Sequence, residues 1–376
     1  MSSANFQIKV HGRVDDLSRD WPDADDSSGC ALYVFQSRTF LRAWEASYGE
    51  AHKAQLCLIE VRDQNQRPVL FVPFCIMQRY GARILSFMDD GVSDYNAPIL
   101  FEDAPHWDVA GAEALLKQIF AALPPFDMVA FEKMPQEVEG RPNPFWGLSN
   151  RDCSAGTHWV TLDRPMPEIE QSIRGYSTIA KRGKALRRAG RYRFLVTRDA
   201  QERATFLETM LQQKQKRFED TKVPGFETHP EKRRFFEMVT EPLAAVNALH
   251  FSVLTMDDAV VATMWSVTRK RHYCAMITTF EDGIWNKYSP GKVLMLRLIE
   301  ALKADDYDCF DLGFGNEPWK NDFANIEIPM RDYVVARTLR GKLALAYQRT
   351  INGLRTTRLY KRLRPLKWEL LRRLSR

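Results

Sequence analysis

The sequence predicts an α+β protein made of two similar units, each with a mixed and mostly antiparallel sheet flanked by helices. The first observation is the order of elements, because three strands, a helix and a further strand occur twice along the chain. The second is a pair of similar phrases at matching places, LPPFDMVAFEK at 123–133 and KADDYDCFDLGF at 303–314. A third observation, a basic C-terminal segment in which leucines recur at helical steps, predicts a helical tail after the two units. A chance likeness between short strings of elements is the alternative to a true repeat.

The first unit is expected at residues 30–165, after an N-terminal extension at 1–29. Its first helix places apolar side chains on one face behind a Ser/Thr-rich start, and the polar run DQNQR marks a hairpin. Two prolines end its second helix. The expected elements are a helix at 37–48, strands at 55–62, 68–78 and 82–88, a helix at 107–123 and a strand at 126–133.

The second unit is expected at residues 166–336, followed by a basic amphipathic helical tail at 337–376. Three consecutive runs rich in β-branched and aromatic residues predict its strands, and the helix after them opens on Ser-Pro-Gly. The expected elements are helices within 166–190 and 200–217, strands at 250–256, 259–269 and 272–280, a helix at 291–304 and a strand at 307–312.

The charge of the chain is divided between an acidic body and a basic tail. The 376 residues carry a formal net charge of +6, yet residues 337–376 hold thirteen Lys or Arg and one acid, so the remainder is net negative. This division excludes a uniform nucleic-acid-binding surface, which the basic composition alone would suggest. A hydrophobic share of 45% is typical of globular chains.

The cysteines and the apolar runs indicate the compartment. Six widely spaced cysteines, without a Cys-x-x-Cys pair or a nearby His, predict free buried thiols rather than disulfides or a metal site. The N-terminus has no apolar signal-peptide core, and no apolar run reaches the roughly 18 residues that cross a bilayer. We therefore expect a cytoplasmic protein without a bound metal.

Residues that suit an anion site begin the last long helix of the second unit. The tripeptide Ser-Pro-Gly at 289–291 follows a strand and a polar loop, so free backbone N–H groups at the helix start are expected to attract an anion. Lys287 and Lys292 flank this start and suit a phosphate or pyrophosphate. The alternative is a core helix capped by Ser289, with two solvated lysines.

The strand after that helix ends in DLGFGNEPWK at 311–320, which combines two carboxylates, a lysine, two glycines and two aromatic rings. Ligand crevices commonly form at that end of a strand in α/β architectures. Asp311 and Glu317 both suit a general base beside Lys320. The alternative is a glycine-rich turn held by one salt bridge.

The run YSPG at 288–291, the helix after it and the run DLGFGNEPWK form a recognisable pattern. It resembles the CelD-like acyltransferases of the GNAT superfamily, a group associated with bacterial cellulose and exopolysaccharide biosynthesis. Leu312 replaces the group's phenylalanine and Trp319 its tyrosine, so no role for a phenol hydroxyl at position 319 is expected. The resemblance covers about residues 32–335, and two such units are similar to the Fem-type transferases that use aminoacyl-tRNA.

The resemblance implies two tandem GNAT-like units that use acetyl-CoA or another acyl-CoA as donor. In that superfamily the acyl carbonyl pairs with a splayed strand, here within 275–280, and the CoA pyrophosphate lies on the next helix N-terminus. YSPGK stands where the superfamily has a glycine-rich loop. The implied donor-binding residues are Thr278, Thr279, Lys287, Ser289, Gly291 and Lys292. The implied catalytic residues are Asp311 or Glu317 as base, Tyr288 as acid, and Lys320 as an anion-binding or orienting group.

In the first unit, the polar loop DDGVSDYN at 89–96 is expected either to face the same cleft or to be a solvated acidic loop. Its Asp94 and Tyr95, together with Trp319, are the expected acceptor-binding residues. Cys274 alternates with strand neighbours, and we expect it to pack in the sheet rather than act as a nucleophile.

Two basic segments suggest partners. Residues 174–193 carry eight Lys or Arg and no acid, which suits RNA, a CoA phosphate, an anionic glycan or a plain solvated helix. In the tail, apolar residues recur at helical steps from Leu339 to Leu354 and from Leu359 to Leu374. This pattern suits an anionic membrane surface or a synthase complex. Alternatively, the leucines pack on the body and the arginines pair with its acidic surface.

These features predict an acyl-CoA-dependent N-acyltransferase, acetyl in the simplest case. Its acceptor is expected to be an amino sugar, glycan amine or other small amine of polysaccharide or cell-envelope metabolism. Two alternatives stay open: an aminoacyl-tRNA-dependent transferase of Fem type, with tRNA the less favoured partner, and a non-catalytic scaffold of a polysaccharide synthase complex. The tail adds a peripheral position at the inner face of the membrane.

Overall fold

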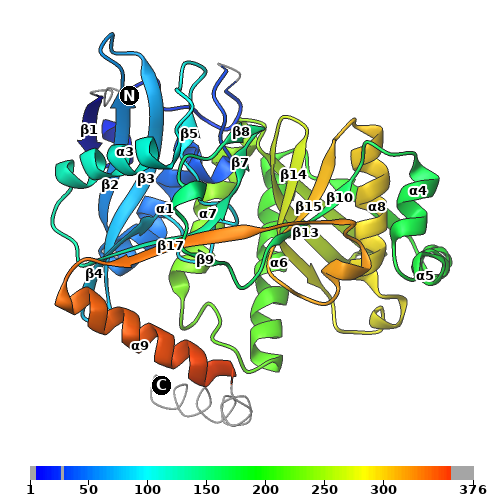
Figure 1. The fold of residues 1–376 in the computed structure, drawn as a ribbon. Helices are drawn as coiled ribbons and strands as arrows, with labels where there is room; N and C mark the ends of the chain where they lie inside the picture. Colours follow the sequence, from blue (N-terminus) through cyan, green and yellow to red (C-terminus); the bar gives the residue numbers. More distant parts are fainter. Residues whose placement is uncertain (1–5, 27–28, 357–376) are drawn as a thin grey trace.

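The computed structural model describes residues 6–26 and 29–356, in which two large sheets stand side by side (Figure 1). The first sheet has, in spatial order, β1 (Gln7–His11), β2 (Gln55–Arg62), β3 (Pro68–Arg79), β4 (Ala82–Phe87), β6 (Met128–Pro135), β17 (Met330–Ala336) and β9 (Arg151–Asp152), with β5 (Ile99–Leu100) beside β3. The second has β11 (Tyr192–Val196), β12 (Leu249–Met256), β13 (Ala259–Arg269), β14 (His272–Phe280), β15 (Cys309–Phe314), β10 (Thr157–Thr161) and β16 (Ile326–Ile328). A short hairpin joins β7 (Glu137–Val138) and β8 (Arg141–Pro142).

Helices cover the faces of both sheets (Figure 1). One face of the first sheet packs on α3, one face of the second packs on α5 and α8, and a third core lies between the sheets with α1, α6 and α7. The helices are α1 (Arg38–Trp44), α2 (Glu50–His52), α3 (Val109–Ala122), α4 (Met166–Ser172), α5 (Tyr176–Arg188), α6 (Ala200–Asp220), α7 (Pro230–Ala245), α8 (Pro290–Ala304) and α9 (Leu339–Thr356).

The α+β class and the repeated order of elements are confirmed. Each sheet contains four consecutive antiparallel strands, of which the last three follow the predicted order, and the fourth pairs in parallel with a strand that follows a helix. Local signals account for several boundaries. The Ser37 side chain accepts a hydrogen bond from the N–H of Phe40 at the start of α1, and Asp108 does the same for α3.

Two strands cross between the units, so the expected boundary at 165/166 does not separate the sheets. β10 lies before that boundary but pairs with β15 of the second sheet, and β17 lies after it but pairs with β6 of the first. Figure 1 shows β17 as a long strand running from the second sheet to the first. These pairings join residues far apart in sequence, which a local pattern does not reveal.

The expected N-terminal extension is largely part of the first unit. Its β1 extends the first sheet by pairing with β2, and Trp21 is buried against Phe71 with ring centroids 5.3 Å apart. The segment expected as an extension therefore already contributes to the core of the first unit.

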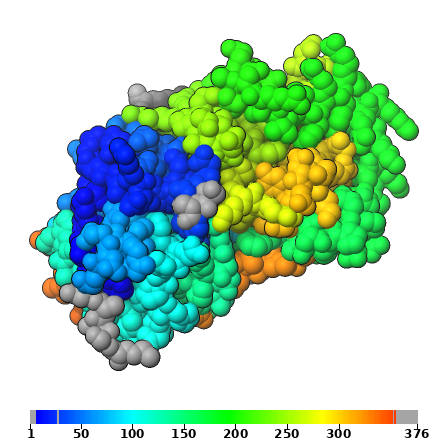
Figure 2. All heavy atoms as spheres, turned by 90° about the horizontal axis from the view of Figure 1, so that it is seen from above, coloured from blue at the N-terminus to red at the C-terminus, as the bar shows by residue number. Residues whose placement is uncertain are grey.

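A shared core joins the two units. Phe40 of α1 packs on Phe235 of α7 with ring centroids 5.0 Å apart, and Trp265 of the second sheet belongs to the same buried cluster. The space-filling view in Figure 2 shows the two parts of the chain in contact along a broad boundary. The units are consequently held together by apolar packing as well as by the crossing strands.

Candidate functional site

The centre of the second sheet holds a fork between two parallel strands. β14 and β15 pair only from His272–Cys309 to Cys274–Asp311, and beyond these three pairs they part. Met276 is an extra residue in β14 where the register with β13 shifts, so a bulge marks the same place. A cavity of about 630 Å³ opens between the parted strands and is bounded by α6, α8 and one loop of the first unit.

The start of α8 forms one wall of this cavity. Ser289 has a left-handed backbone with φ of 52°, and its side chain does not cap the helix. Instead, its Oγ accepts a hydrogen bond from Arg182 Nη1 at 2.6 Å. The alternative of a helix capped by the Ser289 side chain is therefore wrong, and the positive end of the α8 dipole faces the cavity at residues 289–292.

Cationic side chains surround that wall. Lys292 lines the cavity and its Nζ lies 2.8 Å from Asp322 Oδ2. From α6, Lys214 and Arg217 also line it, and burial lowers the pKa of Lys214. The α6 residues were not expected at the site, because their place beside α8 depends on tertiary packing rather than on a local motif.

Asp94 is the residue that the first unit contributes to the cavity. Its carboxylate lies at the parting of the strands, so close to Gly313 that a Cβ there would be 2.6 Å from Asp94 Oδ2. The same Cβ would be 2.8 Å from the carbonyl oxygen of Ala275, and Gly313 has φ of 78°. Glycine at 313 thus allows the carboxylate to enter the fork.

The surroundings of Asp94 favour its neutral form. Burial raises its pKa to about 7, and the carboxylate of Asp311 adds to this rise. The cations Lys133 and Lys320 and a backbone hydrogen bond from Phe314 act in the opposite direction. A carboxyl group that titrates near neutral pH in a cavity is suited to general base chemistry.

Lys320 and Glu317 form a pair at the end of β15. Lys320 is buried, and its Nζ donates to the carbonyl oxygens of Gly313 at 3.0 Å and Phe314 at 2.8 Å. Its Nζ also lies 2.9 Å from Glu317 Oε2. Partial burial raises the pKa of Glu317, but the hydrogen bond and charge of Lys320 outweigh it and leave that pKa below its usual value.

Asp311 lies behind the cavity rather than on its wall. It is fully buried, with Oδ1 accepting from the N–H of Gly313 at 2.8 Å and Oδ2 lying 3.1 Å from His272 Nε2. The hydroxyl of Tyr95 donates to the same Oδ2 and also accepts from Trp159 Nε1 at 2.8 Å. Asp311 and Tyr95 therefore belong to a buried network that supports the fork.

The network also holds His272 in its charged form. Burial alone would lower the pKa of His272, but its contacts with Cys309 and Asp311 raise that pKa to about 10. The imidazolium, from the first paired position of β14, and the Asp311 carboxylate, from the last paired position of β15, then form an ion pair.

The structure brings most of the expected site residues together. Thr278, Thr279, Ser289, Gly291, Lys292, Asp94, Glu317, Trp319 and Lys320 line the cavity. Four expected residues do not line it, namely Asp311, Tyr95, Lys287 and Tyr288. Lys287 instead lies over the Tyr288 ring at 5.0 Å, and that ring packs on the core beneath α8.

The Thr279 hydroxyl is engaged within the protein, because it bonds to Thr263 and to Gln213 Oε1, both at 2.6 Å. Cys274 is buried in the sheet, and none of the six cysteines is joined to another. Within residues 6–26 and 29–356, no three His, Cys, Asp or Glu side chains are grouped as metal ligands. In the same ranges no helix has both the length and the hydropathy that crossing a bilayer requires.

The segment that builds this cavity has known relatives. Residues 174–321 match the acetyltransferase (GNAT) domain family. The second unit is therefore similar to GNAT domains. This segment runs from α5 to the end of β15, so it includes the fork, the α8 N-terminus and the cations of α6. A search of curated proteins found no match to the chain.

Solved structures extend the likeness to both units. FemX is similar with a TM-score of 0.52 at 8% identity, covering 78% of this chain and 91% of FemX. A protein of unknown function from Bacteroides thetaiotaomicron has a TM-score of 0.51 at 10% identity, with 88% and 100% covered. The C-terminal domain of a protein named as a lysylphosphatidylglycerol synthetase from Agrobacterium fabrum has 0.50 at 12%, with 83% and 90% covered.

These likenesses concern the fold, which they share over both units, while the domain match concerns the second unit. The resemblance to GNAT acetyltransferases is thus confined to residues 174–321 by the domain match, and the solved structures share the overall fold of the chain. Neither comparison names the cellulose and exopolysaccharide group, so that finer assignment stays a prediction.

Proposed function

We propose that the protein is an acyl-CoA-dependent N-acyltransferase that moves an acetyl or similar small acyl group onto an amine. The observation that carries the proposal is the fork of the second sheet, where an opened strand, the exposed start of α8 and the carboxyl group of Asp94 meet in one cavity. A thioester bound there supplies an activated carbonyl carbon, and the protein supplies binding, orientation and a base.

The donor fits the wall formed by β14 and α8. Beyond Cys274, β14 has no pairing with β15, so its backbone on that side is open to the amide and carbonyl groups of an acyl-pantetheine chain. The N–H groups of Gly291 and Lys292 at the start of α8, with the Arg182 and Lys292 side chains beside them, suit the pyrophosphate. These cations offset the negative charge of the body, which alone would repel CoA.

Asp94 is the base in this proposal, in place of Asp311. Its carboxylate lies at the fork, whereas that of Asp311 is fully engaged behind it. As the acceptor amine attacks the carbonyl carbon, the ionised Asp94 takes up a proton from the amine, and the thiolate leaves. Lys320 is a positioning residue, because its ammonium group holds the carbonyl oxygens that end β15.

The acceptor fits the opposite wall. Glu317 keeps its negative charge at neutral pH because of Lys320, and a carboxylate at the wall suits an ammonium or hydroxyl group. Trp319 offers an aromatic surface for the face of a sugar ring. An amino sugar has both an amine for the carboxylate and a ring face for the indole. Its assignment to polysaccharide or cell-envelope metabolism rests on the resemblance of the runs YSPG and DLGFGNEPWK to the CelD-like acyltransferases.

Calorimetric titration of the full chain with CoA tests donor binding, and release of free thiol from acetyl-CoA in the presence of glucosamine and other amines tests transfer. We expect saturable CoA binding, with a dissociation constant in the range that is ordinary for Michaelis constants. We also expect thiol release that depends on the amine. Absence of CoA binding well above that range would contradict the proposal. Binding without turnover on any amine would favour the scaffold alternative.

A Fem-type transferase is the second candidate, because the cationic face of α5 reaches the cavity through the Arg182–Ser289 hydrogen bond. Lys181, Arg182, Arg187 and Arg188 are exposed on this helix. Reversing their charges would abolish salt-sensitive binding of aminoacyl-tRNA in a gel-shift assay if this candidate is right. Weak binding that ignores the reversals would remove it.

A further inference from the structure

The outer side of α9 carries a row of exposed apolar side chains. Leu339, Leu343, Tyr347 and Leu354 are 73%, 65%, 54% and 51% exposed, and their spacing places them along one side of the helix. Tyr80 extends this row, because its ring centroid lies 5.5 Å from that of Tyr347 and it is itself 49% exposed. We call these five side chains the α9 row. A contiguous apolar surface of this kind marks an interaction site more often than a scatter of single residues does.

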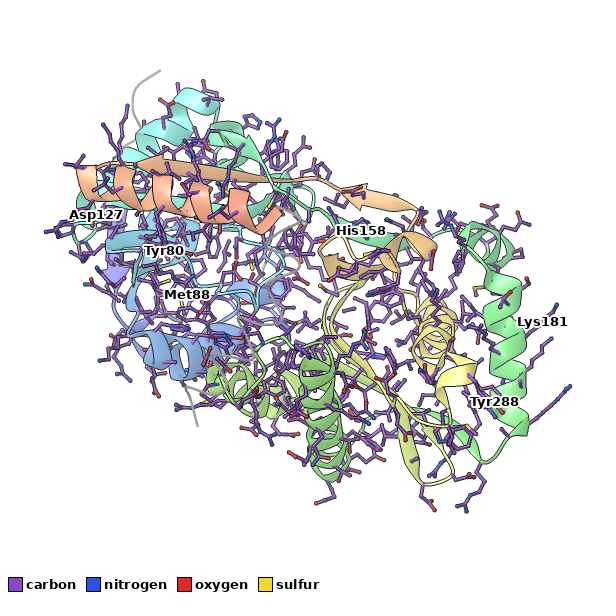
Figure 3. The ribbon with its side chains drawn as sticks, turned by 90° about the horizontal axis from the view of Figure 1, so that it is seen from below. Tyr80, Met88, Asp127, His158, Lys181 and Tyr288 are labelled. Carbon is purple, nitrogen blue, oxygen red and sulfur yellow. The ribbon has the colours of Figure 1, made fainter. Side chains whose placement is uncertain are left out.

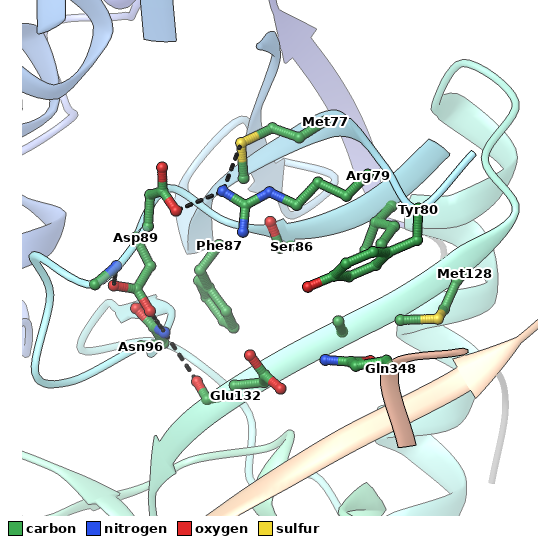
Figure 4. A pocket seen from close by; sticks show the side chains of 14 residues that line it. Met77, Arg79, Tyr80, Ser86, Phe87, Asp89, Asn96, Met128, Glu132 and Gln348 are labelled. Carbon is green, nitrogen blue, oxygen red and sulfur yellow. Dashed lines mark hydrogen bonds and ion pairs between the residues drawn. The ribbon is translucent and has the colours of Figure 1, made fainter. Parts of the chain in front are cut away.

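The inner side of α9 is already occupied. Ala344 is buried, and Gly341 lies so close to Asp127 that a Cβ would be 2.1 Å from the carbonyl oxygen of Asp127. The Thr338 hydroxyl donates to Asp127 Oδ1 at 2.6 Å, which anchors the helix start. Gln348 closes a small hollow over β3, β4 and β6 (Figure 4). The helix is thus fixed to the first sheet through its other side. The alternative that the leucines of the tail pack on the body is therefore wrong for the leucines of the α9 row.

The charge of α9 decides what can cover the row. Arg340, Lys342 and Arg349 are exposed, and the helix contains no acidic residue. Residues 357–376, which lie outside the described structure together with the expected apolar repeat at 359–374, carry eight further Lys or Arg and one acid. Like charges therefore oppose coverage of the row by that segment or by α9 of a second copy. RNA would match the cations but leaves the apolar row without a partner.

We propose that the α9 row and its flanking cations dock the protein on an anionic membrane surface. The apolar side chains enter the interface between headgroups and acyl chains, and Arg340, Lys342 and Arg349 contact lipid phosphates. This inference is independent of the acyl-transfer chemistry, because it rests on the far side of the first unit.

The proposed docking surface and the start of α8 lie in different units of the molecule. Figure 1 shows α9 beside the first sheet and α8 within the second unit. In Figure 3, Tyr80 and Asp127 lie near α9, whereas Lys181 and Tyr288 lie at the opposite end of the molecule.

Cosedimentation of the full chain with vesicles tests the proposal. One set of vesicles contains phosphatidylcholine alone, and the other contains phosphatidylcholine mixed with phosphatidylglycerol. We expect binding to the mixed vesicles and little to the neutral ones. The double variant Leu343→Ser/Tyr347→Ser should weaken binding about tenfold, and Arg340→Glu/Lys342→Glu at least as much.

Two matched controls separate this surface from general effects. Val109→Ser removes an apolar side chain that is 52% exposed elsewhere and should leave binding unchanged. Lys181→Glu/Lys184→Glu alters the net charge equally on α5 and should change binding less than the α9 reversal. Thermal unfolding of each variant shows whether it folds. Should a variant unfold, loss of wild-type binding in high salt still tests the electrostatic part.

Several outcomes would overturn the proposal. They are equal binding to neutral and anionic vesicles, no binding to either, and binding that the α9 variants leave unchanged, which would assign it to residues 357–376. Light scattering that shows a dimer disrupted by Leu343→Ser/Tyr347→Ser would assign the row to a second copy. RNA binding that depends on the cations but not on the apolar pair would do the same for nucleic acid.

Discussion

The two units contain the same fork, and they treat it differently. In the first sheet β4 and β6 pair only at Ile84–Met128 and Leu85–Val129, and the loop at 89–97 then enters the space between them. Asn96 bonds to the backbone of β6 there, with its N–H 3.0 Å from the carbonyl oxygen of Lys133. A hollow of about 150 Å³ remains (Figure 4), against about 630 Å³ in the second unit.

The N-termini of the helices that precede the parallel strands, α3 and α8, also differ in how open they are to an anion. The N-terminus of α3 is capped by the carboxylate of Asp108, whereas that of α8 has no side-chain cap and faces the larger cavity. A capping carboxylate repels the anion that an open helix start would bind. The second unit therefore keeps an open fork and an uncapped helix start, which suit a donor. In the first unit the loop at 89–97 fills the corresponding space, and the same loop places Asp94 in the cavity of the second unit.

The largest effect is expected from Asp94→Asn, which tests whether the first unit serves the second. The amide keeps the size of the side chain but removes the base, so the turnover of amine acylation should fall roughly a hundred- to ten-thousandfold. Steady-state thiol release measures it. The matched control is Asp103→Asn, an exposed acid of the first unit that should retain full turnover. Comparable activity in both variants would break the comparison.

The pH profile sharpens the same point. Because the pKa of Asp94 is raised to about 7, the carboxyl is protonated and inactive as a base below that pH and ionised above it. Turnover should therefore rise about tenfold per pH unit up to pH of about 7 and then level off. In Asp94→Asn this rise should vanish. A profile that is flat from pH 5 to 9 in the wild type would argue against Asp94.

Ser289→Asp makes the start of α8 resemble that of α3. A carboxylate at this position should compete with the pyrophosphate for the helix N–H groups and raise the dissociation constant of CoA roughly tenfold. Calorimetry measures it. The reverse change Asp108→Asn in α3 should leave CoA affinity as it was. Equal effects at both helices would mean that the second unit is no more suited to the donor than the first.

The smallest effect concerns the buried contact between the loop and the second unit. Tyr95→Phe removes the hydroxyl shared with Asp311, Trp159 and Thr157, and should lower the free energy of unfolding by about 1–3 kcal/mol. Urea denaturation measures it. Tyr33→Phe is the control, because the Tyr33 hydroxyl contacts the carbonyl oxygen of Glu137 near the surface, and a loss of no more than about 1 kcal/mol is expected.

Most of the fold could be predicted because its elements carry local signals. The hairpin of β2 and β3 and the strands β13 and β14 have clear apolar runs between polar turns, and α3 ends before two prolines. β1, β10, β11 and β17 were not expected, since short strands of mixed polarity depend on distant partners. α7 was also missed, because Pro242 lies inside it and interrupts the helical signal.

The candidate site could be predicted in its residue types but not in its arrangement. Glu317 and Lys320 line the same cavity as the start of α8, because strand ends and helix starts meet at one edge of a sheet. The separation of Asp94 from Asp311 could not be foreseen. Both are acids with a glycine nearby in the sequence, and only the tertiary structure shows that one enters the fork while the other lies buried behind it in β15.

The exchange of β10 and β17 between the sheets has a consequence for how the chain can be divided. A fragment that ends before β10 lacks β17 of the first sheet, and one that begins after β10 lacks an inner strand of the second. Each fragment would expose unpaired backbone groups at a sheet edge and have an incomplete core. Neither half is therefore expected to be soluble when produced alone. Heating should then unfold both sheets in a single calorimetric transition. A circular permutation or fusion that divides the chain between the two repeats would separate strands that pair in the same sheet.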